Sequence, residues 1–285
     1  MYLKEFTFPD GDMEFDFLMT IQRKCYETYY PFQILTRNDI TRVELMPITI
    51  FYGSNGSGKT TALNVIAEKF QLLRDSSYNK SNFYQDYVDM CKYELNREIP
   101  LNSRIITSDD VFDYMLNVRN INEGIDSKRE ELFEEYLEAK YSNFKMRSME
   151  DYDQLKKVNL SRSKTQSKYV KENLMDNIRE YSNGESAFRY FTEKIGENGL
   201  FLLDEPENSL SPKRQLELVD FLKDSARYFN CQFIISTHSP FFLAMDNVVI
   251  YDFDECPVVI KPWTALENVN IYYNFFKEHE KDFHI

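Results

Sequence analysis

The run from Gly53 to Thr60, GSNGSGKT, constrains the fold of this chain more than any other stretch. It fits the phosphate-binding P-loop pattern G-x-x-x-x-G-K-[ST] at every fixed position. The apolar run 48–52 before it indicates a buried strand, and apolar residues spaced by three and four after it predict a helix. Glycines let successive backbone N–H groups turn toward one anion, and the helix N-terminus adds its dipole. This order therefore predicts a nucleotide-binding core.

Residue types assign roles within the loop. We expect Lys59 to reach the β- and γ-phosphates of the nucleotide and the Thr60 hydroxyl to hold Mg²⁺. The other residues expected to bind the nucleotide are Gly53, Ser54, Asn55, Gly56, Ser57, Gly58 and Thr61. The alternative is a glycine-rich turn that binds nothing, which the flanking strand and helix disfavour.

Two more apolar runs are followed by residues that could bind a metal ion or transfer a proton. Leu200–Leu203 is followed by Asp204, expected to hold Mg²⁺ directly or through water, and by Glu205, expected to polarise or orient the attacking water. The run Gln232–Ser236 leads to His238, which we expect to donate to the γ-phosphate and to sense its loss. A purely structural role is the alternative for this histidine.

The segment from Tyr181 to Glu185 precedes a predicted helix. One interpretation is a capping box, with Ser182 as N-cap and Glu185 at the third helical position. The other is a second anion site, in which Ser182, Gly184 and Glu185 contact a γ-phosphate. One chain cannot easily place this segment on its own P-loop ligand, so the second interpretation implies a facing partner. The two interpretations are compatible.

Residues upstream of the loop are candidates for the base or ribose. Arg37 and Asn38 are candidate contacts on the adenine side. In the aromatic cluster 29–32, we expect core packing or an edge strand, with stacking of a ring on the base as the alternative.

Composition bounds the class of protein. The net charge of −13 argues against a generally basic, DNA-coating surface. No run approaches the roughly 18 apolar residues of a membrane span, and the N-terminus shows no secretory core, so no membrane insertion is expected. The four cysteines are scattered, as is typical of free cytosolic thiols. These features together predict a cytoplasmic protein.

The chain is expected to form a single domain over residues 1–285. Residues 1–70 and 181–260 would form the nucleotide-binding core, 71–180 an inserted helical lobe, and 261–285 a helical tail. The predicted fold class is α/β, with a mostly parallel central sheet and an antiparallel N-terminal β part made of short strands and turns.

Two stretches outside the core have unusual composition. Residues 156–171 carry six lysines and arginines and no acid, so they form either a solvated loop or a contact with a nucleic-acid backbone. The tail from Lys261 to Ile285 is expected to form a terminal helix that packs on the body and contains four aromatic residues, Tyr272, Tyr273, Phe275 and Phe276.

Four motifs in this order resemble the Walker A, signature, Walker B and switch-histidine motifs of ATP-binding-cassette (ABC) ATPases. They are Gly53 to Thr60, Tyr181 to Glu185, Leu200 to Glu205 and Thr237 to Pro240. Asn55 and the run from Asp204 to Pro212 are most similar to the soluble SMC, RecF and OLD-type branch, in particular to its small stand-alone bacterial predicted ATPases. The resemblance covers both ends of the chain well and the middle poorly.

The resemblance implies a P-loop NTPase fold of the ABC type, with ATP and Mg²⁺ as cofactors. ATP would lie between two head-to-tail protomers of an ATP-dependent homodimer, facing the Ser182, Gly184 and Glu185 of the partner. Hydrolysis would occur at Glu205. The sequence departs from transporters in having Ser211 at the D-loop aspartate and no clear Q-loop glutamine; Asp109 occupies the plausible place and is a candidate Mg²⁺ contact.

The function implied is that of an ATP hydrolase that couples closure and opening to a nucleic-acid or protein partner, as in DNA maintenance or phage defence. An ATP-binding subunit of an ABC transporter and a slow, nucleotide-switched clamp or scaffold are the alternatives. The sequence does not distinguish ATP from GTP or identify the partner.

Overall fold

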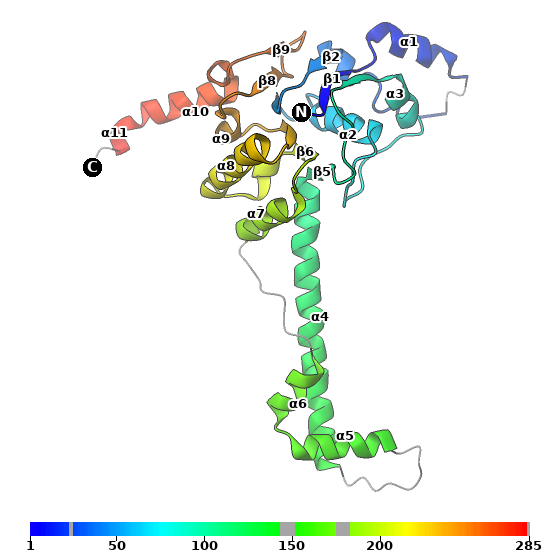
Figure 1. Ribbon diagram of the computed structural model, residues 1–285, viewed down its shortest axis with the longest axis vertical. Coiled ribbons are helices and arrows are strands. Elements are labelled where there is room, and N and C mark those ends of the chain that lie inside the picture. Colours follow the sequence, from blue (N-terminus) through cyan, green and yellow to red (C-terminus); the bar gives the residue numbers. More distant parts are fainter. Residues whose placement is uncertain (23–24, 143–151, 175–182, 284–285) are drawn as a thin grey trace. The chain divides into compact units, whose positions relative to one another are not determined.

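In the described part of the chain, a six-stranded sheet carries the P-loop, with the strand order β5-β6-β7-β3-β8-β9 (Figure 1). Its strands are β3 (Ile48–Tyr52), β5 (Arg104–Thr107), β6 (Leu200–Asp204), β7 (Gln232–Ser236), β8 (Val249–Asp252) and β9 (Val259–Ile260). Every pairing is parallel except that of β8 with β9. Every residue of β3, β6 and β7 is buried, as expected for parallel strands covered on both faces. The prediction of a mostly parallel central sheet is confirmed.

The structure is a computed structural model that describes residues 1–22, 25–142, 152–174 and 183–283. The chain divides into two compact units. The first comprises Met1–Phe112 and Asn183–Ile285, and the second comprises Asp113–Ser182.

A three-stranded antiparallel sheet accompanies the parallel one in the described first unit. It has the order β2-β1-β4, formed by β1 (Leu3–Thr7), β2 (Arg42–Glu44) and β4 (Lys92–Leu95). The predicted antiparallel N-terminal β part is therefore confirmed. Its third strand comes from residues 71–112, which the sequence analysis assigned to the helical lobe but which belong to the first unit, because β4 and β5 complete its two sheets.

Helices occupy the segments between the strands. In the first unit the α-helices are α1 (Gly11–Thr20), α2 (Lys59–Lys69), α3 (Tyr84–Met90), α7 (Asn183–Lys194), α8 (Pro212–Tyr228), α9 (Pro240–Leu243), α10 (Glu267–Glu278) and α11 (Glu280–Phe283). Short 3₁₀ helices are η1 (Leu35–Asn38), η3 (Pro206–Ser209) and η4 (Trp263–Ala265). The expectation of only strands and turns near the N-terminus is wrong for α1, because the Asp10 side chain accepts from the Met13 N–H at 2.8 Å and caps a helix there.

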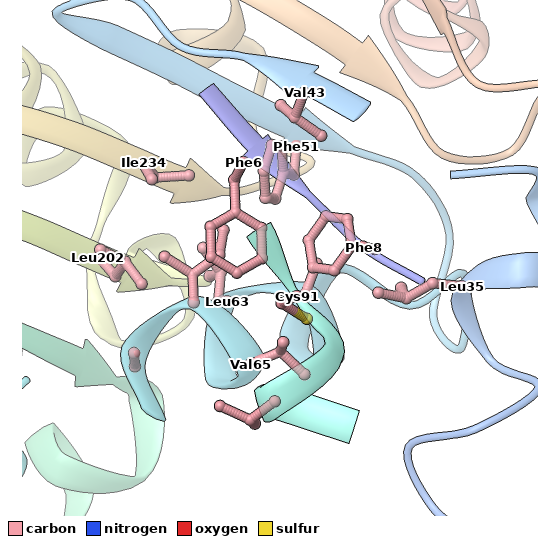
Figure 2. Close-up of a cluster of buried hydrophobic side chains, with 14 of the residues drawn as sticks. Phe6, Phe8, Leu35, Val43, Phe51, Leu63, Val65, Cys91, Leu202 and Ile234 are labelled. Atoms are coloured by element: carbon pink, nitrogen blue, oxygen red, sulfur yellow. The ribbon is translucent and has the colours of Figure 1, made fainter. Parts of the chain in front are cut away.

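The main core lies where β1, β3 and α2 meet (Figure 2). Phe6, Phe51 and Leu63 have no exposed surface, and Leu202 of β6 and Ile234 of β7 extend the same cluster. Because burying each such side chain contributes roughly 1.5–3 kcal/mol, the helix that follows the P-loop is firmly held against the sheet.

The second unit is helical in its described part, as predicted for the inserted lobe. It contains α5 (Tyr152–Ser163), α6 (Gln166–Asn173) and most of α4 (Ser108–Tyr141), whose first turns belong to the first unit. Leu132, Tyr136, Tyr169 and Val170 form its small buried core.

The basic stretch 156–171 is largely helical rather than a loop. Some of its cations have acidic partners within the same unit: Lys157 pairs with Glu135, and Lys164 with Glu172. Both pairs are partly exposed, so each contributes little to stability.

The C-terminal tail forms α10, as predicted, and packs on the body near its start. Val269 is the one residue of α10 that is buried. The rings at 272, 273, 275 and 276 are about half exposed, with fractions between 48 % and 60 %. The helix is therefore held at its start and leaves an apolar surface along the rest of its length.

Candidate functional site

The chemistry-bearing residues follow parallel strands that end at the same edge of the sheet. In the register of the sheet, Phe51 of β3 pairs with Ser236 of β7, and Ser236 pairs with Asp204 of β6. The P-loop, the segment of His238 and the segment of Glu205 therefore start side by side. This is the edge at which open α/β sheets bind ligands.

The P-loop backbone adopts conformations that its glycines allow. Gly56 and Gly58 have φ of 86° and 102°, in the left-handed region that L side chains rarely occupy. A Cβ on Gly58 would also lie 3.0 Å from Cδ2 of Leu35, so the positive φ requires glycine there and the leucine would have to shift for any other residue. The loop leads directly into α2, whose N-terminus faces the site.

Polar groups of the loop fit an anion. Lys59 is 4 % exposed, and its Nζ donates to the carbonyls of Gly53 and Ser54 at 2.7 and 2.9 Å. The Ser57 hydroxyl is buried and has no hydrogen-bond partner among the described residues. The Lys59 ammonium group, held only by carbonyls, can donate hydrogen bonds to phosphate oxygens, and so can the unpartnered Ser57 hydroxyl.

A carboxylate already binds the loop. The Ser54 N–H lies 2.8 Å from each oxygen of Asp254, and the Ser54 hydroxyl donates to the same group at 2.7 Å. The sequence analysis missed Asp254, which follows β8, the other neighbour of β3. Its signal was the same as for Asp204, an acid just beyond an apolar strand.

Asp204 contacts Thr60, the second residue of α2. The Thr60 hydroxyl donates to Asp204 Oδ1 at 3.1 Å, and the Ser236 hydroxyl donates to the same oxygen. Burial raises the pKa of Asp204, and the charge of Glu205 adds to this; the two hydroxyls and Lys59 oppose the rise. A buried carboxylate beside a threonine hydroxyl fits a hard divalent cation such as Mg²⁺.

Glu205 lies in the wall of the P-loop cavity. Its backbone has φ of 48°, in the left-handed region, and its N–H donates to the Ser236 carbonyl at 3.0 Å. Its Oε2 accepts from Asn208 Nδ2 at 2.9 Å. The cavity has a volume of about 380 Å³ and is lined by Ile34, Asn55, Gly56, Gly58, Lys59, Thr60, Thr61 and Glu205.

His238 lies between two carboxylates. Its Nδ1 is 4.0 Å from Glu205 Oε1 and 3.6 Å from Glu207 Oε1. Glu207 is buried, and its Oε1 also accepts from the Thr237 hydroxyl at 2.7 Å and from the His238 N–H at 2.9 Å. The sequence analysis gave Glu207 no role, because nothing local indicates that a side chain of η3 holds the segment after β7.

Residues expected on the adenine side have other contacts. The Asn38 side-chain amide donates to the Phe253 carbonyl at 2.6 Å and to the Ser57 carbonyl at 3.4 Å, which ties η1 to the loop. Arg37 does not line the P-loop cavity. Tyr30 donates to the Thr61 hydroxyl at 3.2 Å and packs against Tyr84, so this ring of the upstream aromatic cluster lies in the core.

Gly184, Glu185 and Asp109 do not line the P-loop cavity. Ser182 lies outside the described residues. Gly184 is at the start of α7 beside η3, where a Cβ would lie 3.7 Å from the Ser209 carbonyl, and Glu185 is its neighbour in the same turn. Asp109 is exposed at the start of α4.

Comparison with known families agrees with this arrangement. A family model described as an AAA domain, putative AbiEii toxin of a type IV TA system, matches residues 126–244, which include Asp204, Glu205 and His238. The P-loop precedes the matched range. The match covers less than half of the 285 residues.

No curated protein matches this chain. Among solved structures, it is similar to the Smc head domain with an extended coiled coil from Pyrococcus furiosus, bound to the C-terminal domain of ScpA (TM-score 0.39, 14 % identity, covering 84 % of this chain and 95 % of that one). It is also similar to the SMC head domain from Thermotoga maritima, with a TM-score of 0.39 and 14 % identity, covering 92 % of this chain and 99 % of that one. A third similar structure is a dimeric ATP-binding cassette in a post-hydrolysis state, bound to ADP and Pi. Its TM-score is 0.35 at 13 % identity, covering 79 % of this chain and 90 % of that one.

No helix in the described part of the chain combines the length and the apolar character needed to cross a bilayer.

Proposed function

We propose that this chain is a P-loop ATPase that hydrolyses Mg-ATP, and that Glu205 activates the attacking water. One observation carries the proposal: Glu205 lines the same cavity as Lys59 and Thr60, and Asp204 at the end of β6 contacts Thr60. A carboxylate, a buried ammonium group and a hydroxyl–carboxylate pair at one helix N-terminus are the groups that phosphoryl transfer to water requires.

The residues would divide the work as follows. Lys59 exchanges its two carbonyl partners for the β- and γ-phosphate oxygens, and the loop N–H groups replace the Asp254 carboxylate by phosphate. Thr60 and Asp204 hold Mg²⁺, which neutralises charge on the phosphates when bound. Glu205 takes a proton from water, and His238, oriented by Glu207, donates to the γ-phosphate.

A second copy of the chain would complete the site. The start of α7, with Gly184 and Glu185, does not line the P-loop cavity of its own chain. We infer that this helix N-terminus, with Ser182, binds the γ-phosphate held by a partner protomer, so that ATP closes a head-to-tail dimer. Closure and reopening would then act on a protein or nucleic-acid partner. The toxin–antitoxin description of the matched family supports a defence setting.

Solution mass and turnover of Glu205→Gln test the proposal. We expect phosphate release to fall at least ~100-fold, because the general base is lost, while nucleotide binding persists. Light scattering of this variant should show twice the monomer mass with Mg-ATP and the monomer mass without it. Adding Ser182→Arg should abolish the doubling.

Glu278→Gln, an exposed carboxylate on α10, is the matched control and should retain wild-type turnover. Full phosphate release by Glu205→Gln would contradict the catalytic assignment. A mass unchanged by ATP despite tight binding would contradict the homodimer.

A further inference from the structure

A second cavity, separate from the P-loop cavity, lies beside the switch segment. It has a volume of about 550 Å³ and is lined by residues of the start of α8, of the segment leading into α9, and of α10. Figure 1 labels these three helices. Trp263, Tyr272, Tyr273 and Phe276 supply aromatic wall. Polar wall comes from Glu207 and His238. The wall of this cavity therefore combines aromatic side chains with one carboxylate.

The Glu207 carboxylate is incompletely satisfied. Only 7 % of the residue is exposed. Its Oε1 accepts from the Thr237 hydroxyl and the His238 N–H, whereas its Oε2 is buried and has no hydrogen-bond partner among the described residues. A buried carboxylate oxygen without a donor is costly, so a cation that approaches this wall would be favoured.

The aromatic wall and the carboxylate favour the same kind of ligand. Aromatic faces attract cations, and a guanidinium group also stacks on rings and is more weakly hydrated than an ammonium group. The net charge of −13 further favours a basic partner. The chemistry that the cavity would recognise is therefore an arginine side chain.

The surroundings of the cavity indicate that the arginine belongs to a protein. Beyond the wall, α10 also exposes Ile271 by 58 % and Phe275 by 54 %. Exposed apolar residues on the same helix that lines the cavity favour an occupant that is part of a macromolecule over a free small cation.

We propose that this cavity binds an arginine presented by an apolar segment of a partner protein. The occupant would meet the same carboxylate that holds the backbone of His238, so the partner would contact the switch segment directly. The proposal concerns binding alone and goes beyond the proposed hydrolysis.

Trp263 provides the measurement, because it is the only tryptophan in the sequence and lines the cavity. The intact protein, without nucleotide, is titrated with the peptide acetyl-Leu-Arg-Leu-amide while tryptophan fluorescence is recorded. The matched peptide carries citrulline, which has the shape of arginine but no charge. We expect a saturable change with the arginine peptide and an affinity at least ~5-fold lower with the citrulline peptide.

Variants locate the binding. We expect the substitutions Glu207→Gln and Tyr272→Ala each to lower the affinity for the arginine peptide at least ~5-fold. Tyr272 is 48 % exposed, so its replacement tests the cavity even if Glu207→Gln disturbs the switch segment. Tyr228→Ala, which removes a 65 %-exposed ring at the other end of α8, is the control and should bind normally.

Three results would overturn the proposal. The first is no saturable change in fluorescence; the second is equal affinity for the citrulline peptide, which would make the cavity an apolar subsite. The third is concentration-dependent self-association that Tyr272→Ala abolishes and the peptide leaves unchanged, which would assign this surface to a second copy. Because the titration contains no nucleotide, failure here is distinguishable from failure of the proposed hydrolysis.

Discussion

The backbone conformation of a single residue in this protein depends on residues distant in the sequence. Glu205 keeps a left-handed backbone although it is not glycine. Such a conformation costs of order 1–3 kcal/mol and persists only where the surroundings fix it. Here its N–H is held by Ser236 of β7, and its side chain by Asn208. The strained turn aims the carboxylate into the P-loop cavity, which links the backbone geometry to the proposed catalytic role.

The cysteines give a prediction at the same scale. Burial raises the pKa of Cys91 to about 12, whereas Cys25 and Cys256 are exposed. Because the thiolate is the reactive form, a raised pKa lowers the reactive fraction at pH 8 and slows modification. We expect Ellman's reagent to modify Cys25 and Cys256 at least ~100-fold faster than Cys91 in the native protein.

Stopped-flow absorbance at pH 8 measures these rates, with the double variant Cys25→Ser/Cys256→Ser as control. That variant should lose the fast phase entirely. A fast phase that remained in the double variant would show that a buried thiol is reactive.

At the scale of elements, the start of α4 depends on one carboxylate. Asp110 is 3 % exposed and accepts from the N–H groups of Ser76 and Thr107, both at 2.6 Å, and from the Thr107 hydroxyl at 2.8 Å. It thereby fixes both the end of β5 and the segment after α2. Its neighbour Asp109, the candidate Mg²⁺ contact, is exposed in the same turn.

Replacing Asp110 with alanine should lower the free energy of unfolding by about 2 kcal/mol, because buried N–H donors lose their acceptor. Asp109→Ala should change it by less than about 0.5 kcal/mol, as exposed substitutions usually do. Urea denaturation followed by circular dichroism measures both. Equal effects of the two variants would refute the assignment of the capping role to Asp110.

At the scale of the whole molecule, one side chain joins the two sheets of the first unit. Gln232 of β7 has no exposed surface. Its Oε1 accepts from the N–H groups of Tyr2 and Leu3 at 2.7 and 2.9 Å, and its Nε2 donates to the carbonyls of Leu3 and Met46 at 2.7 and 3.2 Å. The N-terminal strand β1 is therefore tied to the parallel sheet through a residue some 230 positions away.

Gln232→Leu keeps the size of this side chain but removes its amide. We expect the free energy of unfolding to fall by about 3 kcal/mol, since several buried backbone groups lose their partners. Gln85→Leu on the exposed face of α3 is the control and should be close to neutral. Thermal unfolding followed by calorimetry compares the two, and a neutral Gln232→Leu would remove the link between the sheets.

The sequence by itself determined the local chemistry. Gly53 to Thr60 fits the pattern that predicts strand, loop and helix, and all three are present, because glycine conformations and apolar periodicity act over a few residues. The apolar runs before Asp204 and His238 likewise predicted buried strands, and the mostly parallel sheet followed from their alternation with helices.

Tertiary structure decided which distant side chains meet. Asp254 follows an apolar run, but nothing in that run indicates that its carboxylate reaches Ser54, 200 positions away. Glu207, which holds the segment of His238, has no signature in its own neighbourhood. The same holds for α10, which was predicted to pack on the body and does so only near its start. Whether such a helix is covered depends on what surface lies opposite, and composition carries no information about that.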